Sequence, residues 1–130
     1  MEYLFVYGTL MQKCTRNEWS AFLLKNARYL GEAKIRGDLY KVDYYPGLIK
    51  SENWVYGELF EIQDSSYIFH YLDQYEDYRP NDPENSLYTR EKSEVWLTDN
   101  SVKSFSSWVY YYKKPFRQFE KYPKGRFIEE

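Results

Sequence analysis

Residues 54–62 show the clearest periodicity in the chain, and this segment constrains the possible folds most strongly. Apolar Val55 and Leu59 would lie on one face of an extended strand, with Phe60 and Ile62 on the other. Such an alternation with a period of two residues predicts a β-strand. Because isolated strands are not stable in water, other parts of the chain must supply partners for it.

Further strands are predicted on both sides of this segment. Two long runs, 87–98 and 102–113, are separated only by the turn formers at 99–100, so we expect them to pair in antiparallel fashion. The shorter predicted strands cover residues 3–7, 33–42 and 48–49. A turn at Pro46-Gly47 should precede the last of these. Gly37 should mark a bulge or a close backbone approach.

Two amphipathic helices are predicted between the strands. Thr15 and Glu18 have the spacing of a capping box, and apolar residues follow at helical spacing, which predicts a helix over residues 15–28 that closes at Gly31. Asp64 is a suitable N-cap for a second helix that should end near Tyr75.

The tally of about six strands and two helices predicts an α+β fold, a small mixed β-barrel or highly curved sheet flanked by helices. No repeat or linker divides the chain, so residues 1–130 should form one domain with a core at about 3–113. The 16 tyrosines combine apolar rings with polar tips and should edge this core with hydroxyl groups. The charged tail, 114–130, should be loosely docked or frayed.

Composition excludes several kinds of function. A formal charge of −2 and a pI near 5.6 argue against nucleic-acid and anionic-membrane partners. One cysteine, Cys14, and one histidine, His70, are too few for a structural zinc site, and no phosphate-binding glycine pattern occurs. His70 is interpreted as a surface or core-edge residue. We expect a soluble cytoplasmic protein, a monomer or weak homodimer, without a metal or cofactor.

The first predicted strand stops at Gly8, which permits a positive φ and a close approach of the backbone. Backbone N–H groups that follow it, just before a predicted helix, suit a carboxylate or a phosphate. An ordinary core strand and turn is the simpler interpretation of the local pattern alone.

Glu76 is the carboxylate that best fits acid–base chemistry. It follows Leu72 by four residues, on the buried stripe of the second predicted helix, and it lies at the helix C-terminus. Burial and the helix dipole would both raise its pKa, so that it could take and return a proton. A solvated glutamate in a charged run with Asp73, Asp77 and Arg79 is the alternative.

Taken together, these features resemble the γ-glutamylcyclotransferase-like family. The landmarks occur in family order: Tyr7-Gly8-Thr9-Leu10, Pro46-Gly47, Val55-Tyr56-Gly57-Glu58-Leu59-Phe60, Leu72-Asp73-Gln74-Tyr75-Glu76, Tyr88-Thr89-Arg90 and Trp108-Val109-Tyr110. The resemblance covers roughly residues 3–112. It departs from the family at Met11-Gln12-Lys13, which lacks the usual glycine, and at Asp77, which stands where glycine often follows the glutamate. As an adjacent acid, Asp77 would raise the pKa of Glu76 further.

The resemblance implies a single cavity for a γ-glutamyl group. The backbone at Tyr7, Gly8, Thr9 and Leu10 would bind the substrate, Tyr88 and Tyr110 would line the cavity, and Glu76 would be the general acid/base. The implied reaction is an intramolecular attack of the substrate α-amine that releases 5-oxoproline. We expect Tyr44-Tyr45 and the loop 78–86 to shape the leaving-group side.

Two alternatives stay open. The domain could be a noncatalytic module of the same fold that binds a γ-glutamyl group or another small amide, although the presence of Glu76 favours an enzyme. An aromatic-rich barrel could also bind an oligosaccharide or single-stranded nucleic acid by stacking, but the net negative charge disfavours nucleic acid.

Overall fold

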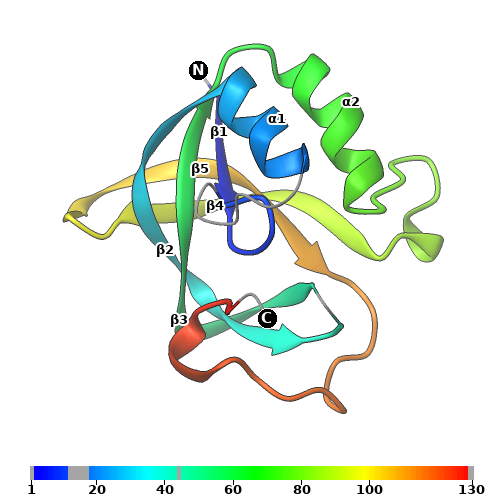
Figure 1. The fold of residues 1–130 in the computed structure, drawn as a ribbon. Coiled ribbons are helices and arrows are strands. Elements are labelled where there is room, and N and C mark those ends of the chain that lie inside the picture. Colours follow the sequence, from blue (N-terminus) through cyan, green and yellow to red (C-terminus); the bar gives the residue numbers. More distant parts are fainter. Residues whose placement is uncertain (1, 12–17, 44, 129–130) are drawn as a thin grey trace.

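The computed structural model describes residues 2–11, 18–43 and 45–128. These residues form a β-barrel with two helices on its side (Figure 1). The strands of the described chain are β1 (Glu2–Val6), β2 (Ala27–Lys41), β3 (Pro46–Ile62), β4 (Tyr88–Leu97) and β5 (Asn100–Tyr112). The helices are α1 (Glu18–Asn26) and α2 (Ser65–Tyr75), with short 3-10 turns at Pro83–Asn85 and Pro123–Gly125. These elements confirm the predicted α+β class.

The sheet closes in the order β1-β3-β2-β4-β5. β3 pairs in antiparallel fashion with both β1 and β2, and the predicted antiparallel pair, β4 and β5, is confirmed. A short parallel contact between β1 and β5, at Leu4 and Trp108, completes the barrel. Leu4, Phe5, Leu59 and Phe60 are fully buried in its core.

The described residues form five strands where about six were predicted, because the predicted strands at 48–49 and 54–62 belong to a single strand over residues 46–62. Pro46-Gly47, predicted as a turn, begins β3 instead. A proline at the first position of a strand removes no ladder hydrogen bond that the strand needs. A Cβ on Gly47 would lie 2.9 Å from the Tyr112 side chain, so glycine lets β3 pass close to β5. The register shift between Arg36 and Asp38 confirms the bulge predicted at Gly37.

The first helix is shorter than predicted at its C-terminal end. It ends at Asn26, and β2 begins at once with Ala27, which pairs with Ile62. Pairing with β3 therefore overrides the helical pattern of residues 27–28, and Gly31 lies inside β2 rather than at a helix end. Thr15, the predicted capping residue, lies outside the described residues.

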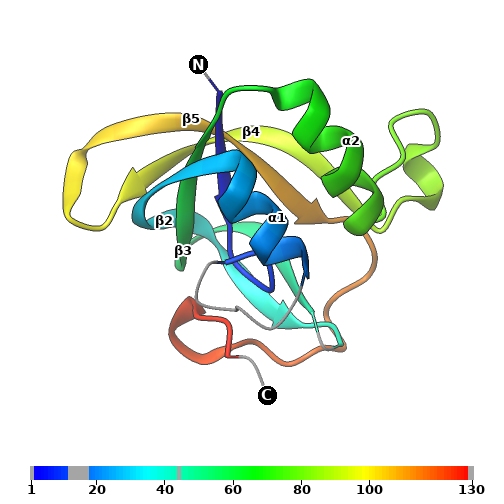
Figure 2. The same ribbon diagram turned by 45° about the horizontal axis from the view of Figure 1, so that its top comes forward.

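The two helices lie side by side against one flank of the barrel (Figure 2). The ring of Phe22 on α1 packs against Tyr67 and Tyr71 of α2. On its inner side α2 buries Ile68, Phe69 and Leu72. His70 is exposed on this helix, which confirms its interpretation as a surface residue. Within the described chain, every helix is too short or too polar to cross a membrane.

The C-terminal tail is docked, contrary to the prediction of a loose or frayed end. The Tyr122 N–H donates to the Leu39 carbonyl at 2.8 Å, and Tyr122 and Phe127 are buried. Figure 1 shows the tail passing beside the lower ends of β2 and β3. Its charged composition suggested a solvated segment, but the aromatic residues between the charges anchor it.

Candidate active site

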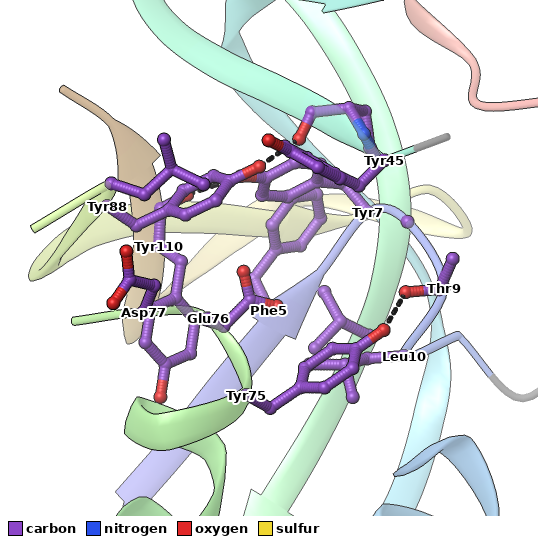
Figure 3. A pocket seen from close by; sticks show the side chains of 14 residues that line it. Phe5, Tyr7, Thr9, Leu10, Tyr45, Tyr75, Glu76, Asp77, Tyr88 and Tyr110 are labelled. Atoms are coloured by element: carbon purple, nitrogen blue, oxygen red, sulfur yellow. Dashed lines mark hydrogen bonds between the residues drawn. The ribbon is translucent and has the colours of Figure 1, made fainter. Parts of the chain in front are cut away.

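A cavity of about 300 Å³ opens where the end of β1 meets the end of α2 (Figure 3). All the residues that the sequence marked as catalytic or substrate-binding line it: Tyr7, Gly8, Thr9, Leu10, Glu76, Tyr88 and Tyr110. They come from the turn that follows β1, the C-terminus of α2, β4 and β5. Barrel closure thus brings together residues as far apart in the chain as Tyr7 and Tyr110, which are separated by 103 positions.

The turn after β1 forms one wall of the cavity. The Met11 N–H donates to the Gly8 carbonyl at 3.0 Å and closes the turn. Gly8 does not use the positive φ that it permits. Its role is the close approach, because a Cβ at this position would lie 2.8 Å from Cγ of Pro46. Thr9 shares a short hydrogen bond with the Tyr75 hydroxyl, which ties the turn to α2.

The C-terminus of α2 forms the opposite wall and presents Glu76. The Tyr78 N–H donates to the Asp73 carbonyl and the Asp77 N–H to the Gln74 carbonyl, the two bonds of a Schellman motif. Asp77 has φ 54° in this motif. Aspartate tolerates this left-handed conformation better than most residues, so it can replace the glycine that the family often has there.

The carboxyl group of Glu76 is unusually disposed to hold a proton. Figure 3 shows the side chain extending from the helix end into the cavity. Burial, and next the negative charge of Asp73, raise its pKa from 4.5 to about 8. No hydrogen bond or ion pair of this carboxyl group is present among the described residues, so nothing there favours its charged form. The sequence predicted that Asp77 would raise the pKa of Glu76, but the neighbouring acid that does so is Asp73. The carboxylate of Asp77 instead accepts from Arg79 Nε at 3.1 Å.

Asp73 lies one helical turn before Glu76 in a very different environment. Its two oxygens accept from Nε and Nη2 of Arg90 at 2.9 and 3.1 Å, and the Tyr110 hydroxyl donates to Oδ1 at 2.7 Å. Sequence analysis marked Asp73 and Arg90 as family landmarks without giving them a role. The structure shows that the two landmarks are one ion pair between α2 and β4.

Three tyrosines offer protonated hydroxyl groups around the cavity. Burial is the main cause that raises the pKa of Tyr7, Tyr88 and Tyr110, so each phenol keeps its proton. Tyr7 donates to the Tyr110 carbonyl and Tyr88 to the Pro46 carbonyl, each at 2.5 Å. These bonds fix the ring positions in the aromatic wall.

Several lining residues were missed or only partly predicted. Tyr75 lines the cavity beside Glu76, and its helical position gave no sign of this. Tyr45 lies on the wall as expected, whereas Tyr44 is outside the described residues. No residue of the loop 78–86 lines this cavity, so that expectation is wrong; Asp77 and Leu87, which flank the loop, line it instead. In residues 2–11, 18–43 and 45–128, no three acidic, histidine or cysteine side chains gather as metal ligands would.

The described residues form a small closed barrel whose cavity, lined largely by aromatic side chains, holds a carboxyl group of raised pKa. The sequence model of the family described as "Gamma-glutamyl cyclotransferase, AIG2-like" matches residues 4–129. The chain belongs to this family.

Individual relatives agree with this placement. The γ-glutamylcyclotransferase family protein YtfP of Escherichia coli K12 is 33% identical over 64 residues, which are 48% of this chain and 53% of the relative. The chain thus spans about half the length of the curated relatives it matches. The solution structure of E. coli ytfP has a TM-score of 0.65 at 23% identity, covering 98% of this chain and 96% of that one. Bacillus subtilis YkqA gives 0.65 at 24% identity, covering 97% and 39%. These structural likenesses establish the shared fold.

Proposed function

We propose that the chain is a γ-glutamyl cyclotransferase that releases 5-oxoproline from a γ-glutamyl amide. One observation carries the proposal: the carboxyl group of Glu76, without an ion-pair partner in the described chain, shares a cavity with the turn at Gly8 and Thr9. Family membership supports the reaction class.

Glu76 would transfer the proton in both halves of the reaction. As a carboxylate it accepts a proton from the substrate α-ammonium group, and the resulting amine nitrogen attacks the γ-carbonyl carbon. The bond between that carbon and the amide nitrogen breaks, and the departing nitrogen receives both the proton held by Glu76 and the surplus proton of the attacking nitrogen. The products are 5-oxoproline and the protonated amine. An α-amine has a pKa of about 8. Because the pKa of Glu76 is also about 8, the free-energy change of proton transfer between the two groups is close to zero.

The walls of the cavity would hold the substrate in the geometry of attack. The backbone of the turn at Gly8, Thr9 and Leu10 would receive the α-carboxylate and orient the amine. The hydroxyl groups of Tyr88 and Tyr110 would border the γ-glutamyl group, and Tyr45 would border the leaving amine. No step requires a metal or an organic cofactor.

The direct test is turnover by Glu76→Gln, with 5-oxoproline measured after incubation with a panel of γ-glutamyl amino acids and γ-glutamyl amines. Loss of general acid–base catalysis should reduce kcat by about 10²–10⁴. Glu94→Gln is the matched control, because Glu94 is exposed on β4 and does not line the cavity. Near-normal turnover in Glu76→Gln would overturn the proposal. Substrate binding without 5-oxoproline in the wild-type protein would instead support a noncatalytic binding module.

A further inference from the structure

Two carboxyl groups on the last turn of α2 have opposite surroundings. Glu76 extends into the cavity, whereas Asp73 accepts three charge-assisted or hydroxyl hydrogen bonds from Arg90 and Tyr110. Both side chains of the ion pair are largely buried, with Asp73 14% and Arg90 16% exposed. A bidentate pair with so little exposure fixes geometry far better than a surface salt bridge.

Arg90 is held from more than one side. Its guanidinium carbon lies 3.9 Å from the ring centroid of Phe69 on α2 and 4.6 Å from that of Trp108 on β5. The cation is therefore placed between the helix and the sheet by aromatic faces, and Asp73 supplies its negative partner. Tyr110 adds a hydroxyl donor to the same carboxylate.

The position of Arg90 on β4 would otherwise direct its charge toward the site. Arg90 lies two residues after Tyr88, so both side chains leave the same face of the strand, and Tyr88 lines the cavity. No lysine or arginine among the described residues lines the cavity. The ion pair with Asp73 therefore engages Arg90, the cation that β4 carries next to Tyr88 on that face.

We propose that Asp73 is a positioning residue for Glu76: by binding Arg90 and Tyr110, it keeps this cation out of the cavity and fixes the helix turn that presents Glu76. The inference rests on the proposed function for its catalytic consequence. Its structural consequence, the ionisation of Glu76, can be measured without any turnover.

The groups that face Glu76 come from every element around it. The titratable side chains that line the cavity with Glu76 are Tyr7, Tyr45, Tyr75, Asp77, Tyr88 and Tyr110. Asp73 acts on Glu76 from the preceding helical turn, and Arg90 on β4 is the cation paired with Asp73. The phenols of Tyr7, Tyr88 and Tyr110 keep their protons and Asp77 is paired with Arg79, so Asp73 is the charge that acts on Glu76. Its partner Arg90 would act with the opposite sign if it were released toward the cavity. Removing the Asp73 charge and releasing Arg90 both stabilise the carboxylate of Glu76.

The test is Asp73→Asn, read by 13C NMR titration of the Glu76 carboxyl group and by the pH profile of kcat/KM. Assignment of the resonance follows from its absence in Glu76→Gln. We expect the Glu76 titration and the acidic limb of the profile to move to lower pH by about one unit or more. A purely structural role of Asp73 would lower the amount of folded protein and leave both midpoints in place.

Two further variants separate the causes. Asp73→Asn/Arg90→Met removes both charges without leaving one buried and unpaired, so it should fold and should recover part of the shift. Asp77→Asn is the matched control, because asparagine also tolerates a left-handed φ, and it should leave the Glu76 midpoint unchanged. An unshifted midpoint in Asp73→Asn, or no recovery in the double variant, would overturn the inference. If Glu76→Gln keeps its turnover while Asp73→Asn still moves the midpoint, the proposed function fails and the positioning role stands.

Discussion

The cavity at Glu76 and the groove beneath the C-terminal tail are two hollows of the same small barrel whose charged groups are partnered differently. The groove is the larger, at about 520 Å³ against about 300 Å³, and it is lined by parts of β2, β3 and the tail. It is also rich in charge. Size and charge alone would make the groove the better candidate for a binding site.

The difference lies in how the charged groups are partnered. In and beside the groove, Lys121 binds Asp38 at 3.6 Å and Arg126 binds Glu32 at 3.2 Å, while the guanidinium of Arg126 lies 4.2 Å from the centroid of Tyr56. These contacts join the tail to the barrel, so the charges of Lys121 and Arg126 serve docking. In the cavity, Glu76 is left without such a partner and its pKa rises. A buried carboxyl group without an ion-pair partner therefore indicates a functional site better than the volume of the hollow does.

The largest expected effect is on the pH dependence of stability, which arises from Glu76. Its pKa is about 8 in the folded protein and near 4.5 when unfolded, so between these values the folded protein binds a proton that the unfolded chain has released. Raising the pH across this window therefore favours unfolding, by up to about 5 kcal/mol. The free energy of unfolding, measured in urea from pH 4.5 to pH 9, should fall for the wild-type protein relative to Glu76→Gln.

The same experiment has an internal control in the groove. Asp38→Asn removes a carboxylate that is paired with Lys121 and lies outside the cavity, so its curve should keep the same fall with pH as that of the wild-type protein. Parallel curves for wild type and Glu76→Gln would mean that Glu76 is ionised throughout, and the contrast between the two hollows would disappear.

The next effect is expected at Gly125, where the tail meets β3. The residue has φ +65°, and an added Cβ would lie 2.1 Å from the Trp54 carbonyl oxygen. Gly125→Ala should lower the free energy of unfolding by about 2–4 kcal/mol through conformational strain and overpacking. Hydrogen exchange at the Tyr122 N–H, which is bonded to Leu39, should report undocking of the tail.

The activity of Gly125→Ala shows whether the groove contributes to catalysis or only docks the tail. If the groove only docks the tail, the folded fraction of Gly125→Ala should keep the kcat/KM of the wild-type protein within about twofold. Lys124→Gly is the control, because it relieves a non-glycine residue at φ 61° in the same turn and should not undock the tail. A large loss of activity in Gly125→Ala alone would couple the groove to the cavity.

The sequence was most informative where local pattern and chemistry coincide. The alternation at residues 54–62 predicted the C-terminal half of β3, and the helical stripe placed Glu76 at the end of α2. Pro46-Gly47 misled because turn formers are read locally, whereas Tyr112 on a distant strand makes a glycine suitable there. The charge neighbour of Glu76 was misassigned to Asp77 for the same reason: the Schellman turn rotates Asp77 toward Arg79.

Contacts that depend on strand register were beyond reach of the sequence. Asp73 and Arg90 are 17 positions apart, and only the docking of α2 on β4 joins them. Tyr75 lines the cavity because α2 ends beside the turn that follows β1, where the Tyr75 hydroxyl shares a hydrogen bond with Thr9. In the sequence, the position of Tyr75 is fully explained by the helical spacing.

The smallest expected effect is at the Asp38–Lys121 ion pair, and it tests most directly whether the charges of the groove serve only docking. The Lys121 side chain is 53% exposed, so solvent screens the pair. A double-mutant cycle with Asp38→Asn and Lys121→Met should give a coupling free energy of about 0.2–1 kcal/mol in urea unfolding, falling as salt is raised. The kcat/KM should stay unchanged in all three variants. Coupling that is absent for stability yet present in kcat/KM would show that the pair acts on the cavity, and the groove would then be part of the site.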